Sequence, residues 1–252
     1  MELPKFLYHY TSIDTLACIL NSKKLKLTSL CYVDDEKEIN NIVAKYCYVS
    51  CWTAEERESI PMWEMYSNGM KGVRIKLPVN PFIEYPLDKK RFGTSKGFIP
   101  AERILGENTT VMGIGTDCLK AIEYLNEVDL LRKENELNTS IAAGEFNVKN
   151  DLGIYKDSAW EFQKEWRYKY FILPGNYSIV NDPLFPSNMI SGKYPAIEDG
   201  FFIELDENKM QSMEILLGPY TTYGDKLLVE LLRKEYVPSA IVKNSALKIR
   251  KK

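Results

Sequence analysis

Polar and apolar residues alternate between positions 163 and 173, and this is the clearest pattern in the chain. One side of the pattern is polar and the other is aromatic or aliphatic: Gln163, Glu165, Arg167 and Lys169 against Trp166, Tyr168, Tyr170 and Ile172. Alternation at period two predicts an antiparallel strand with one solvated face. On such a strand the Gln163 amide and the Glu165 carboxylate point the same way, about 6.5–7 Å apart.

Shorter patterns predict the elements that begin the chain. Residues 6–11 form an aromatic strand pattern that places Leu7, His9 and Thr11 on one face. Ser12 is a typical N-cap for a helix over 13–20, and 25–28 indicates a short strand. The acidic run 34–38 predicts the start of a solvated polar helix. Residues 46–53 predict a strand that is buried on both sides.

A short helix is predicted from Pro61, because proline is favoured at the first helical position. Trp63 and Tyr66 are three residues apart and therefore share a face of this helix. Gly69 and Gly72 end the helix, and a strand is predicted over 73–77.

The pattern changes between about 80 and 150. A loop over 89–96 precedes a glycine-containing stretch, and a long helix is indicated by apolar residues at helical spacing, namely Leu119, Ile122, Leu125 and Val128. Residues 138–151 resemble a loop. We interpret this segment as a partly helical insertion packed on the main sheet.

Beyond residue 174 the chain is rich in loops up to 198. Strands are predicted over 201–205, 213–217, 240–243 and 247–250, and a helix over 225–234. No repeat or low-complexity segment is evident. The order of elements predicts an α+β fold, with residues 1–252 forming one domain that carries the insertion.

Composition narrows the function classes. The chain has 33 basic and 35 acidic residues, a net charge of −2, which argues against a surface dedicated to nucleic-acid phosphates. It has no signal-peptide pattern and no apolar run long enough to cross a membrane, so a cytoplasmic protein without a membrane partner is expected. The five cysteines are then expected to be free thiols. With one histidine in the chain, a metal site is not expected.

Several common nucleotide and hydrolase motifs are absent. Gly113 and Gly115 lack the third glycine and the strand–turn–helix context of a dinucleotide-binding fingerprint. The sequence contains neither a GxxxxGK[ST] phosphate loop nor a GxSxG nucleophile elbow. A serine triad would have to use His9.

His9 gains interest from two residues further along the chain, Tyr66 and Glu165. A histidine on the first strand, a tyrosine on a short helix and a glutamate on a later strand resemble the His-Tyr-Glu arrangement of the diphtheria-toxin-like ADP-ribosyltransferases. The chain more closely resembles a bacterial family of unassigned function in that superfamily. The matching motifs, in chain order, are Tyr8–Ser12; Asp34, Asp35 and Glu38; Trp63–Tyr66 with Gly72; Lys156, Trp160, Glu165 and Arg167; Gly218; and Ser245–Arg250.

This resemblance covers most of the chain outside the 80–150 insertion. It implies an ADP-ribosyltransferase-like split β-sheet core with flanking helices, and NAD as a substrate without a metal. Glu165 would hydrogen-bond the ribose 2′-hydroxyl and offset the positive charge that develops on the ribose. Tyr66 would stack on the nicotinamide.

The other candidate residues have supporting roles. His9 would hydrogen-bond the adenosine-side ribose, and Thr11 or the neighbouring backbone would hold the nicotinamide amide, with Tyr10 also in the NAD site. Trp63 would either line the pocket or anchor its helix in the core. Gln163 would help to orient the acceptor, although relatives commonly carry a carboxylate there and an amide cannot act as a general base.

Two basic residues near Glu165 leave alternatives open. Arg167 is expected to be an ion-pair partner and not a phosphate ligand. Lys156 is expected to be a solvated lysine, with contact to a pyrophosphate as the alternative.

The implied function is an NAD-dependent mono-ADP-ribosyltransferase that modifies a protein or nucleic acid, in the manner of a bacterial toxin or phage-defence effector. An antitoxin would then be a candidate partner. Two alternatives remain open: an NAD glycohydrolase on the same scaffold, and a degenerate module that binds a nucleotide or a partner without chemistry.

Overall fold

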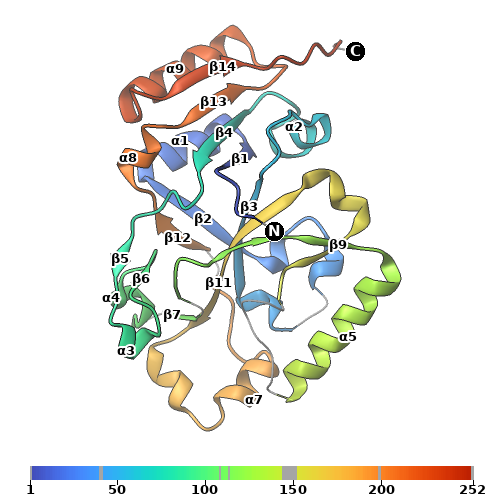
Figure 1. The fold of residues 1–252 in the computed structure, drawn as a ribbon, viewed down its shortest axis with the longest axis vertical. Coiled ribbons are helices and arrows are strands. Elements are labelled where there is room, and N and C mark those ends of the chain that lie inside the picture. The colour runs from blue at the N-terminus through green and yellow to red at the C-terminus, as the bar shows by residue number, and fades with distance from the viewer. Residues whose placement is uncertain are drawn as a thin grey trace.

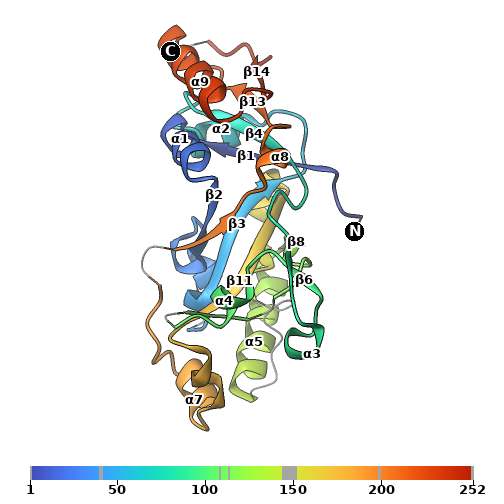
Figure 2. The same cartoon turned by 90° about the vertical axis from the view of Figure 1, so that its left-hand side faces the viewer.

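The structure is a computed structural model that describes residues 2–39, 42–107, 109–112, 114–143, 152–197 and 200–250. Its centre is a ten-stranded mixed sheet, open at both ends. The strands are β1 (Phe6–Thr11), β2 (Lys24–Ser29), β3 (Cys47–Thr53), β4 (Val73–Pro78), β7 (Thr109–Met112), β8 (Leu119–Ala121), β11 (Glu165–Pro174), β12 (Phe201–Glu204), β13 (Glu214–Leu217) and β14 (Ile241–Asn244). Figures 1 and 2 show β3 and β11 running side by side through the middle of the molecule.

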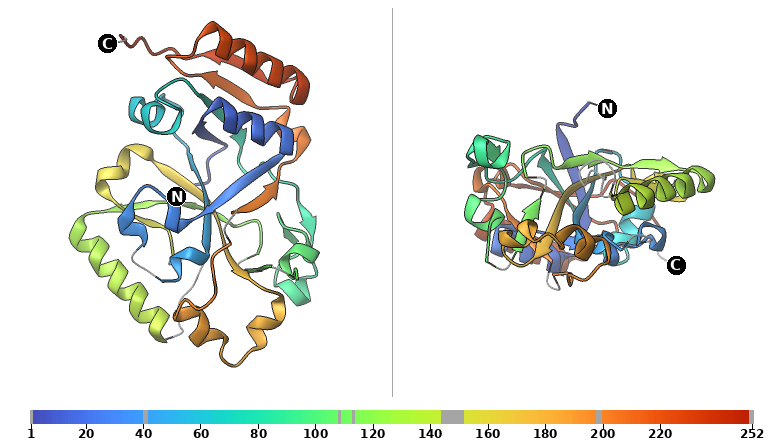
Figure 3. Two further views of the ribbon diagram at one scale, coloured as in Figure 1. Left: turned by 180° about the vertical axis from the view of Figure 1, so that it is seen from behind. Right: turned by 90° about the horizontal axis from the view of Figure 1, so that it is seen from below.

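Short strands and helices surround this sheet. Two small sheets pair β5 (Tyr85–Pro86) with β6 (Lys96–Gly97) and β9 (Glu123–Leu125) with β10 (Tyr155–Asp157). The α-helices are α1 (Ile13–Ser22), α2 (Ile60–Tyr66), α3 (Lys89–Phe92), α4 (Ala101–Ile104), α5 (Glu127–Ala143), α7 (Phe185–Ile190), α8 (Glu207–Met210) and α9 (Tyr223–Tyr236). The 3-10 helices are η1 (Leu30–Tyr32), η2 (Glu36–Ile39), η3 (Ala44–Tyr46), η4 (Ser158–Gln163) and η5 (Tyr177–Asn181). Seen from behind, α1 lies in front of the sheet (Figure 3).

The helix ends agree with the expected local chemistry. Ser12 caps α1 by accepting a hydrogen bond from the Thr15 amide, and Pro61 lies in the first turn of α2. Gly72, just after α2, has a steric role: a Cβ there would lie 2.1 Å from the Thr11 carbonyl oxygen. Glycine therefore lets the chain pass directly against β1.

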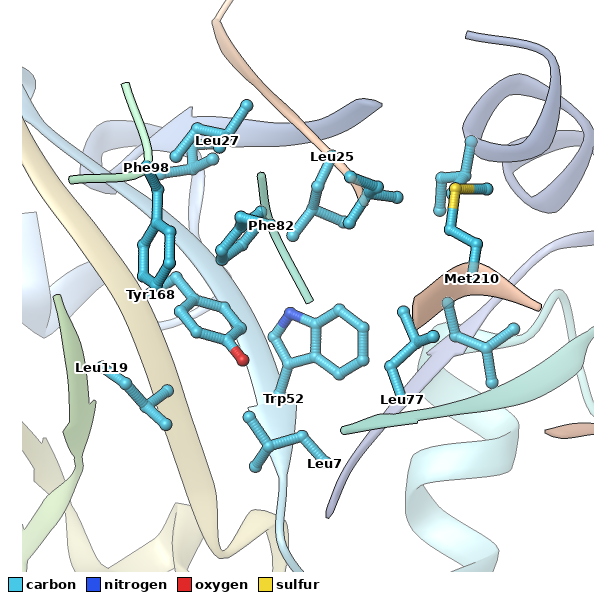
Figure 4. Close-up of a cluster of buried hydrophobic side chains, with 14 of the residues drawn as sticks. Leu7, Leu25, Leu27, Trp52, Leu77, Phe82, Phe98, Leu119, Tyr168 and Met210 are labelled. Carbon is cyan, nitrogen blue, oxygen red and sulfur yellow. The ribbon is translucent and has the colours of Figure 1, made fainter. Parts of the chain in front are cut away.

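The main core lies on one face of the sheet and is built around Trp52. In Figure 4, Trp52 of β3 lies among Leu7, Leu77, Phe82 and Tyr168, which come from widely separated parts of the chain. The rings of Trp52 and Tyr168 are 6.1 Å apart and nearly perpendicular, a favourable edge-to-face arrangement.

The segment 80–150 contributes to this same core. Phe98, Ile104, Val111 and Leu119 are buried in it. Strands β7 and β8 pair with β11 through residues 171–174 and 166–168. The segment therefore extends the main sheet directly.

Three local predictions within and after this segment are wrong. Residues 119–125 form strands, because pairing of β8 with β11 overrides the helical spacing of their apolar side chains, and the helix begins only at Glu127. Residues 89–92, predicted as loop, form α3 between an Asp88 cap and Gly93. Helix α5 continues to Ala143, while 144–151 and Gly113 lie outside the described residues.

The polar run 34–38 and the C-terminal segment also differ from their predictions. The run forms only the single 3-10 turn η2, and Asp35, directly before it, is buried. Residues 247–250 form no strand; Leu247 and Ile249 pack against a small cluster around Trp63.

The prediction that β11 has a solvated face is wrong. Glu165, Arg167 and Lys169 are as buried as the aromatic residues on the opposite face. Arg167 bonds Glu38 and the Gly153 carbonyl, and Lys169 donates to the Leu152 carbonyl. The alternation therefore indicates the strand correctly, but buried polar partners replace the expected water.

Candidate functional site

The sheet divides at β3, and this division creates a pocket. One edge of β3 pairs with β11 along its whole length, from Cys47 to Thr53. The other edge pairs with β2 at Tyr48 and Val49 and with β1 only at Thr53. Residues 50–52 consequently face a gap between β1 and β2.

A pocket of about 330 Å³ lies at this gap. Its size falls within the range of roughly 300–1,000 Å³ that is usual for small-molecule sites. The lining residues come from β1, α1, β2 and the turn after it, β3, α2, β10, η4 and β11. They are Tyr8, His9, Tyr10, Thr15, Lys26, Thr28, Tyr32, Val33, Asp34, Val49, Ser50, Cys51, Trp52, Met62, Tyr66, Lys156, Gln163, Glu165 and Arg167. Consecutive residues of β1 and β3 take part, so strand edges as well as strand faces form the wall.

Five of the seven predicted site residues line this one pocket. They are His9, Tyr10, Tyr66, Gln163 and Glu165. Thr11 and Trp63 do not line it. Thr11 is buried and pairs with Val73 of β4. Trp63 is fully buried, packs edge-to-face on Tyr10 and donates its indole N–H to Glu58, so it anchors α2 in the core.

Glu165 belongs to a buried network of four charges. Arg167 donates from Nε to Glu165 Oε1 at 2.5 Å and from Nη2 to Oε2 at 3.2 Å. Lys156 Nζ is 3.3 Å from the same Oε2 and 3.4 Å from Glu38 Oε1. Arg167 also pairs with both oxygens of Glu38. Two anions and two cations thus balance, as buried charges require.

This network keeps Glu165 ionised. Burial by itself raises the pKa of Glu165, but the charges of Arg167 and Lys156 outweigh burial and lower the pKa from its ordinary value to about 2. The expected ion pair between Arg167 and Glu165 is therefore confirmed. The expectation of a solvated Lys156 is wrong, because this side chain is only 3% exposed and lies between two carboxylates.

Gln163 connects the charged network to Tyr66. It lies in η4 and not on the strand, since Lys164 adopts a left-handed conformation (φ 43°) that separates it from β11. The Gln163 carbonyl accepts from Lys156 Nζ at 2.8 Å, and its amide donates to the Tyr66 hydroxyl at 2.6 Å. Gln163 is 3% exposed, so both ends of its amide are engaged and it holds Tyr66 in place.

Tyr66 has an acidic neighbour on the opposite side. Burial, followed by a hydrogen bond to the Asp34 carboxylate, raises the pKa of the Tyr66 phenol well above its ordinary value. The phenol is therefore neutral, and its hydroxyl is positioned by Asp34 and Gln163 together. The ring lines the pocket wall.

His9 occupies the gap itself. It lies two residues after Leu7 on the core-facing side of β1 and reaches the pocket because β1 has left β3 at this level. Burial lowers the pKa of His9, so the ring is neutral. Its Nδ1 donates to the Cys51 carbonyl at 2.8 Å, which leaves Nε2 as an acceptor. The Cys51 N–H also faces the gap, because the N–H and C=O of one strand residue point to the same side.

Sequence reasoning missed Glu38, Asp34 and Tyr124. Glu38 is expected on a solvated face, yet its side chain is 2% exposed and paired with Arg167. Tyr124 accepts a hydrogen bond from the Glu165 amide at 2.8 Å. The acidic motif Asp34–Glu38 was the available signal, but Arg167, the partner of Glu38, lies 129 residues further along the chain.

Other site chemistries find little support. Burial raises the pKa of the Cys51 thiol well above its ordinary value, which disfavours a reactive thiolate in the pocket. All five cysteines are free. Within the part of the chain that the structure describes, no group of three or more His, Cys, Asp or Glu side chains could hold a metal, and no helix is long and apolar enough to cross a membrane.

Comparison with known proteins identifies one family model. Residues 62–168 match a family described as "Protein of unknown function (DUF2971)". No curated protein and no solved structure matches the chain. The matched range includes Tyr66, Gln163 and Glu165 but not His9, and it includes the whole 80–150 segment, which the expected resemblance had left out. Over residues 62–168 the chain is thus similar to a family of proteins of unknown function.

Proposed function

We propose that the pocket at the gap between β1 and β2 binds NAD, and that the protein is a mono-ADP-ribosyltransferase acting on a protein or nucleic acid. The observation that carries the proposal is the convergence of His9, Tyr66 and Glu165 on one pocket. These three residues come from β1, α2 and β11, and the resemblance to the His-Tyr-Glu transferases requires them to meet. The division of the sheet at β3 agrees with the split core expected for such enzymes.

The chemistry suits a cationic transition state. When the bond between nicotinamide and ribose breaks, its electron pair leaves with the nicotinamide and the ribose carbon becomes positive. An ionised carboxylate in a buried site stabilises such a charge more than it would in water. Glu165 has this form because its pKa is about 2. The Tyr66 ring, fixed by Gln163, would stack on the leaving nicotinamide.

Gln163 takes a different role from the one suggested by the resemblance. Its amide is engaged by Lys156 and Tyr66, so we assign it to holding the Tyr66 ring and not to orienting an acceptor. The acceptor therefore has no assigned base in this site. Water as acceptor would give an NAD glycohydrolase on the same scaffold.

A second candidate is a module that binds a nucleotide without chemistry. One observation favours it: both carboxylate oxygens of Glu165 already accept hydrogen bonds from Arg167 or Lys156. A ribose hydroxyl would have to share these oxygens. If Arg167 and Lys156 keep both oxygens of Glu165 occupied, the protein would bind the nucleotide without turnover.

The test is release of nicotinamide from NAD by wild type and by Glu165→Gln. If Glu165 stabilises the ribosyl cation, turnover falls by roughly 10²–10³, as for the loss of one preorganised electrostatic group. Binding of NAD, measured by calorimetry, should change little because the interaction strengthens in the transition state. Glu136→Gln, at an exposed ion-paired glutamate of α5, is the matched control.

The outcomes separate the candidates. Transfer of label from NAD to a macromolecule supports the transferase, and free ADP-ribose alone supports the glycohydrolase. NAD binding without nicotinamide release supports the binding module. Full activity in a folded Glu165→Gln protein would rule out the proposed role of Glu165. Because Glu165 is buried, each assay is run well below the melting temperature of the variant.

A further inference from the structure

One cation that lines the pocket, Lys26, is set apart from the others by its lack of an ion-pair partner in the described part of the chain. Around Glu165 the charges balance, with Glu38 and Glu165 against Lys156 and Arg167. Lys26, on the β2 wall, has no ion-pair partner among the described residues. The Asp34 carboxylate also lines the pocket, beside Tyr66, so the charges are unevenly placed: the Lys26 ammonium on the β2 side is the one without a paired carboxylate among the described residues.

Lys26 differs in this respect from the neighbouring lysines. Lys23 pairs with Glu207 at 2.7 Å, and Lys24, on the same face of β2, pairs with Glu204 at 3.7 Å. Lys26 instead passes over Gly200, where a Cβ would lie 2.7 Å from Lys26 Cε, and its side chain lines the pocket. The side chain thus rests on glycine backbone near the pocket instead of joining the surface ion pairs.

Two hydroxyl groups line the pocket together with Lys26. Thr28 lies two residues after Lys26 on β2, so the two side chains share a face. Thr15 lies in the first turn of α1, where its hydroxyl accepts from Ser12 and keeps its own hydrogen to donate. A lysine and two hydroxyls beside the start of a ten-residue helix form a combination that favours an anion.

The position of this end relative to Glu165 constrains the ligand. Lys26 is on β2 and Glu165 is on β11, and β3 lies between these strands. Because β2 pairs with β3 only at Thr28 and Ser29 and has parted from it at Lys26, the two backbones are farther apart than two strand spacings, roughly 10 Å. A ligand that reaches both ends must carry its anionic group some distance from the centre that faces Glu165.

We propose that Lys26, Thr15 and Thr28 bind the pyrophosphate of a dinucleotide whose ribosyl centre faces Glu165. The orientation rests on the proposed function, whereas the anion subsite is a property of β2 and the first turn of α1. The substrate class implied by this subsite is a pyrophosphate-linked nucleotide. A nucleoside without phosphate would leave the Lys26 end unused.

The experiment is calorimetric titration of ADP-ribose and of nicotinamide riboside into three proteins: wild type, Lys26→Gln and Lys24→Gln. Lys24→Gln removes the same charge from the same strand outside the pocket, so it controls for long-range electrostatics. We expect Lys26→Gln to weaken ADP-ribose binding about tenfold, the scale of one charge-assisted contact at an accessible site. This loss should shrink as salt is raised.

The proposal is overturned if wild type does not bind ADP-ribose, if Lys26→Gln binds it as wild type does, or if Lys24→Gln loses as much affinity. An equal loss for nicotinamide riboside would also overturn it, because that ligand has no phosphate. No step of this test requires turnover. If the protein does not cleave NAD but Lys26→Gln weakens ADP-ribose binding, the anion subsite is supported and the proposed enzyme activity is rejected. If the protein cleaves NAD and Lys26→Gln leaves KM unchanged, the activity is supported and the subsite is rejected.

Discussion

Two arginines of this chain have similar partners and differ in what surrounds them. Helix α5 carries Arg132 between Asp129 and Glu136, with side chains 41–58% exposed. Strand β11 carries Arg167 between Glu165 and the distant Glu38, with side chains 0–5% exposed. In both places an arginine is paired with two carboxylates, but the pairs of α5 are exposed to water and those of β11 are buried.

Burial decides what an ion pair does. On α5 water already solvates each charge, so the pairs stabilise the helix only slightly and salt screens them. Under β11 each charge depends on its partners, because the free energy of leaving one buried and unpaired is several kcal/mol. The same dependence fixes the protonation of Glu165 and, through Lys156 and Gln163, the position of Tyr66.

The largest expected effect comes from removing the central cation. Arg167→Met leaves Glu165 and Glu38 with Lys156 alone and should destabilise the protein by about 3–5 kcal/mol. Arg132→Met, the matched change on α5, should leave the melting temperature unchanged within error. Urea denaturation of both variants measures the difference. Equal effects would mean that the buried network stabilises the fold no more than the exposed pairs do.

The second expected effect is a dependence of stability on acid pH, which comes from the buried Glu165 of β11. The folded-state pKa of Glu165, about 2, lies below that of an unfolded chain, near 4.5. Its contribution, roughly 3 kcal/mol, is therefore complete above about pH 5 and is lost as the pH falls towards 2. The stability difference between wild type and Glu165→Gln should shrink over this range in a pH series of urea melts. A difference that stays constant down to pH 2 would contradict the assigned protonation.

The third effect tests how the buried network reaches the pocket. Tyr66→Phe keeps the ring but leaves the Gln163 amide without its acceptor, so stability should fall by about 1–3 kcal/mol while NAD affinity changes little. Tyr66→Ala also removes the ring and should weaken NAD binding further. Thermal melts and calorimetry report the two effects separately. Equal losses of affinity in both variants would show that the hydroxyl, and not the ring, contacts the ligand.

Several features could be predicted from the sequence because their causes are local. Ser12 caps α1 and Pro61 opens α2, as the residue types at these positions predict. The alternation after Glu165 identifies β11, and the aromatic run at 6–11 identifies β1. Hydrogen-bond geometry and side-chain period act over a few residues, so such features can be read from a short window.

Other features could not be read in this way. Trp63 and Tyr66 share one short helix, yet the first fills the core and the second lines the pocket, because residues far along the chain surround each. Gln163 and Glu165 look equivalent in sequence, but the left-handed Lys164 separates them. Alternation shows only that the two faces of β11 differ, so it could not reveal that the polar face is buried.

The sequence by itself determined which residues carry charge, which segments form strands and short helices, and which side chains could serve a nucleotide site. Only the tertiary structure decided that β1 and β2 part over β3, that His9, Tyr66 and Glu165 meet at that gap, and that Glu165 is buried among cations. The physical reason is that burial and the ion pairs are set by segments such as 34–38 and 152–157, which lie far from β11 in sequence and pack against it only in the folded chain.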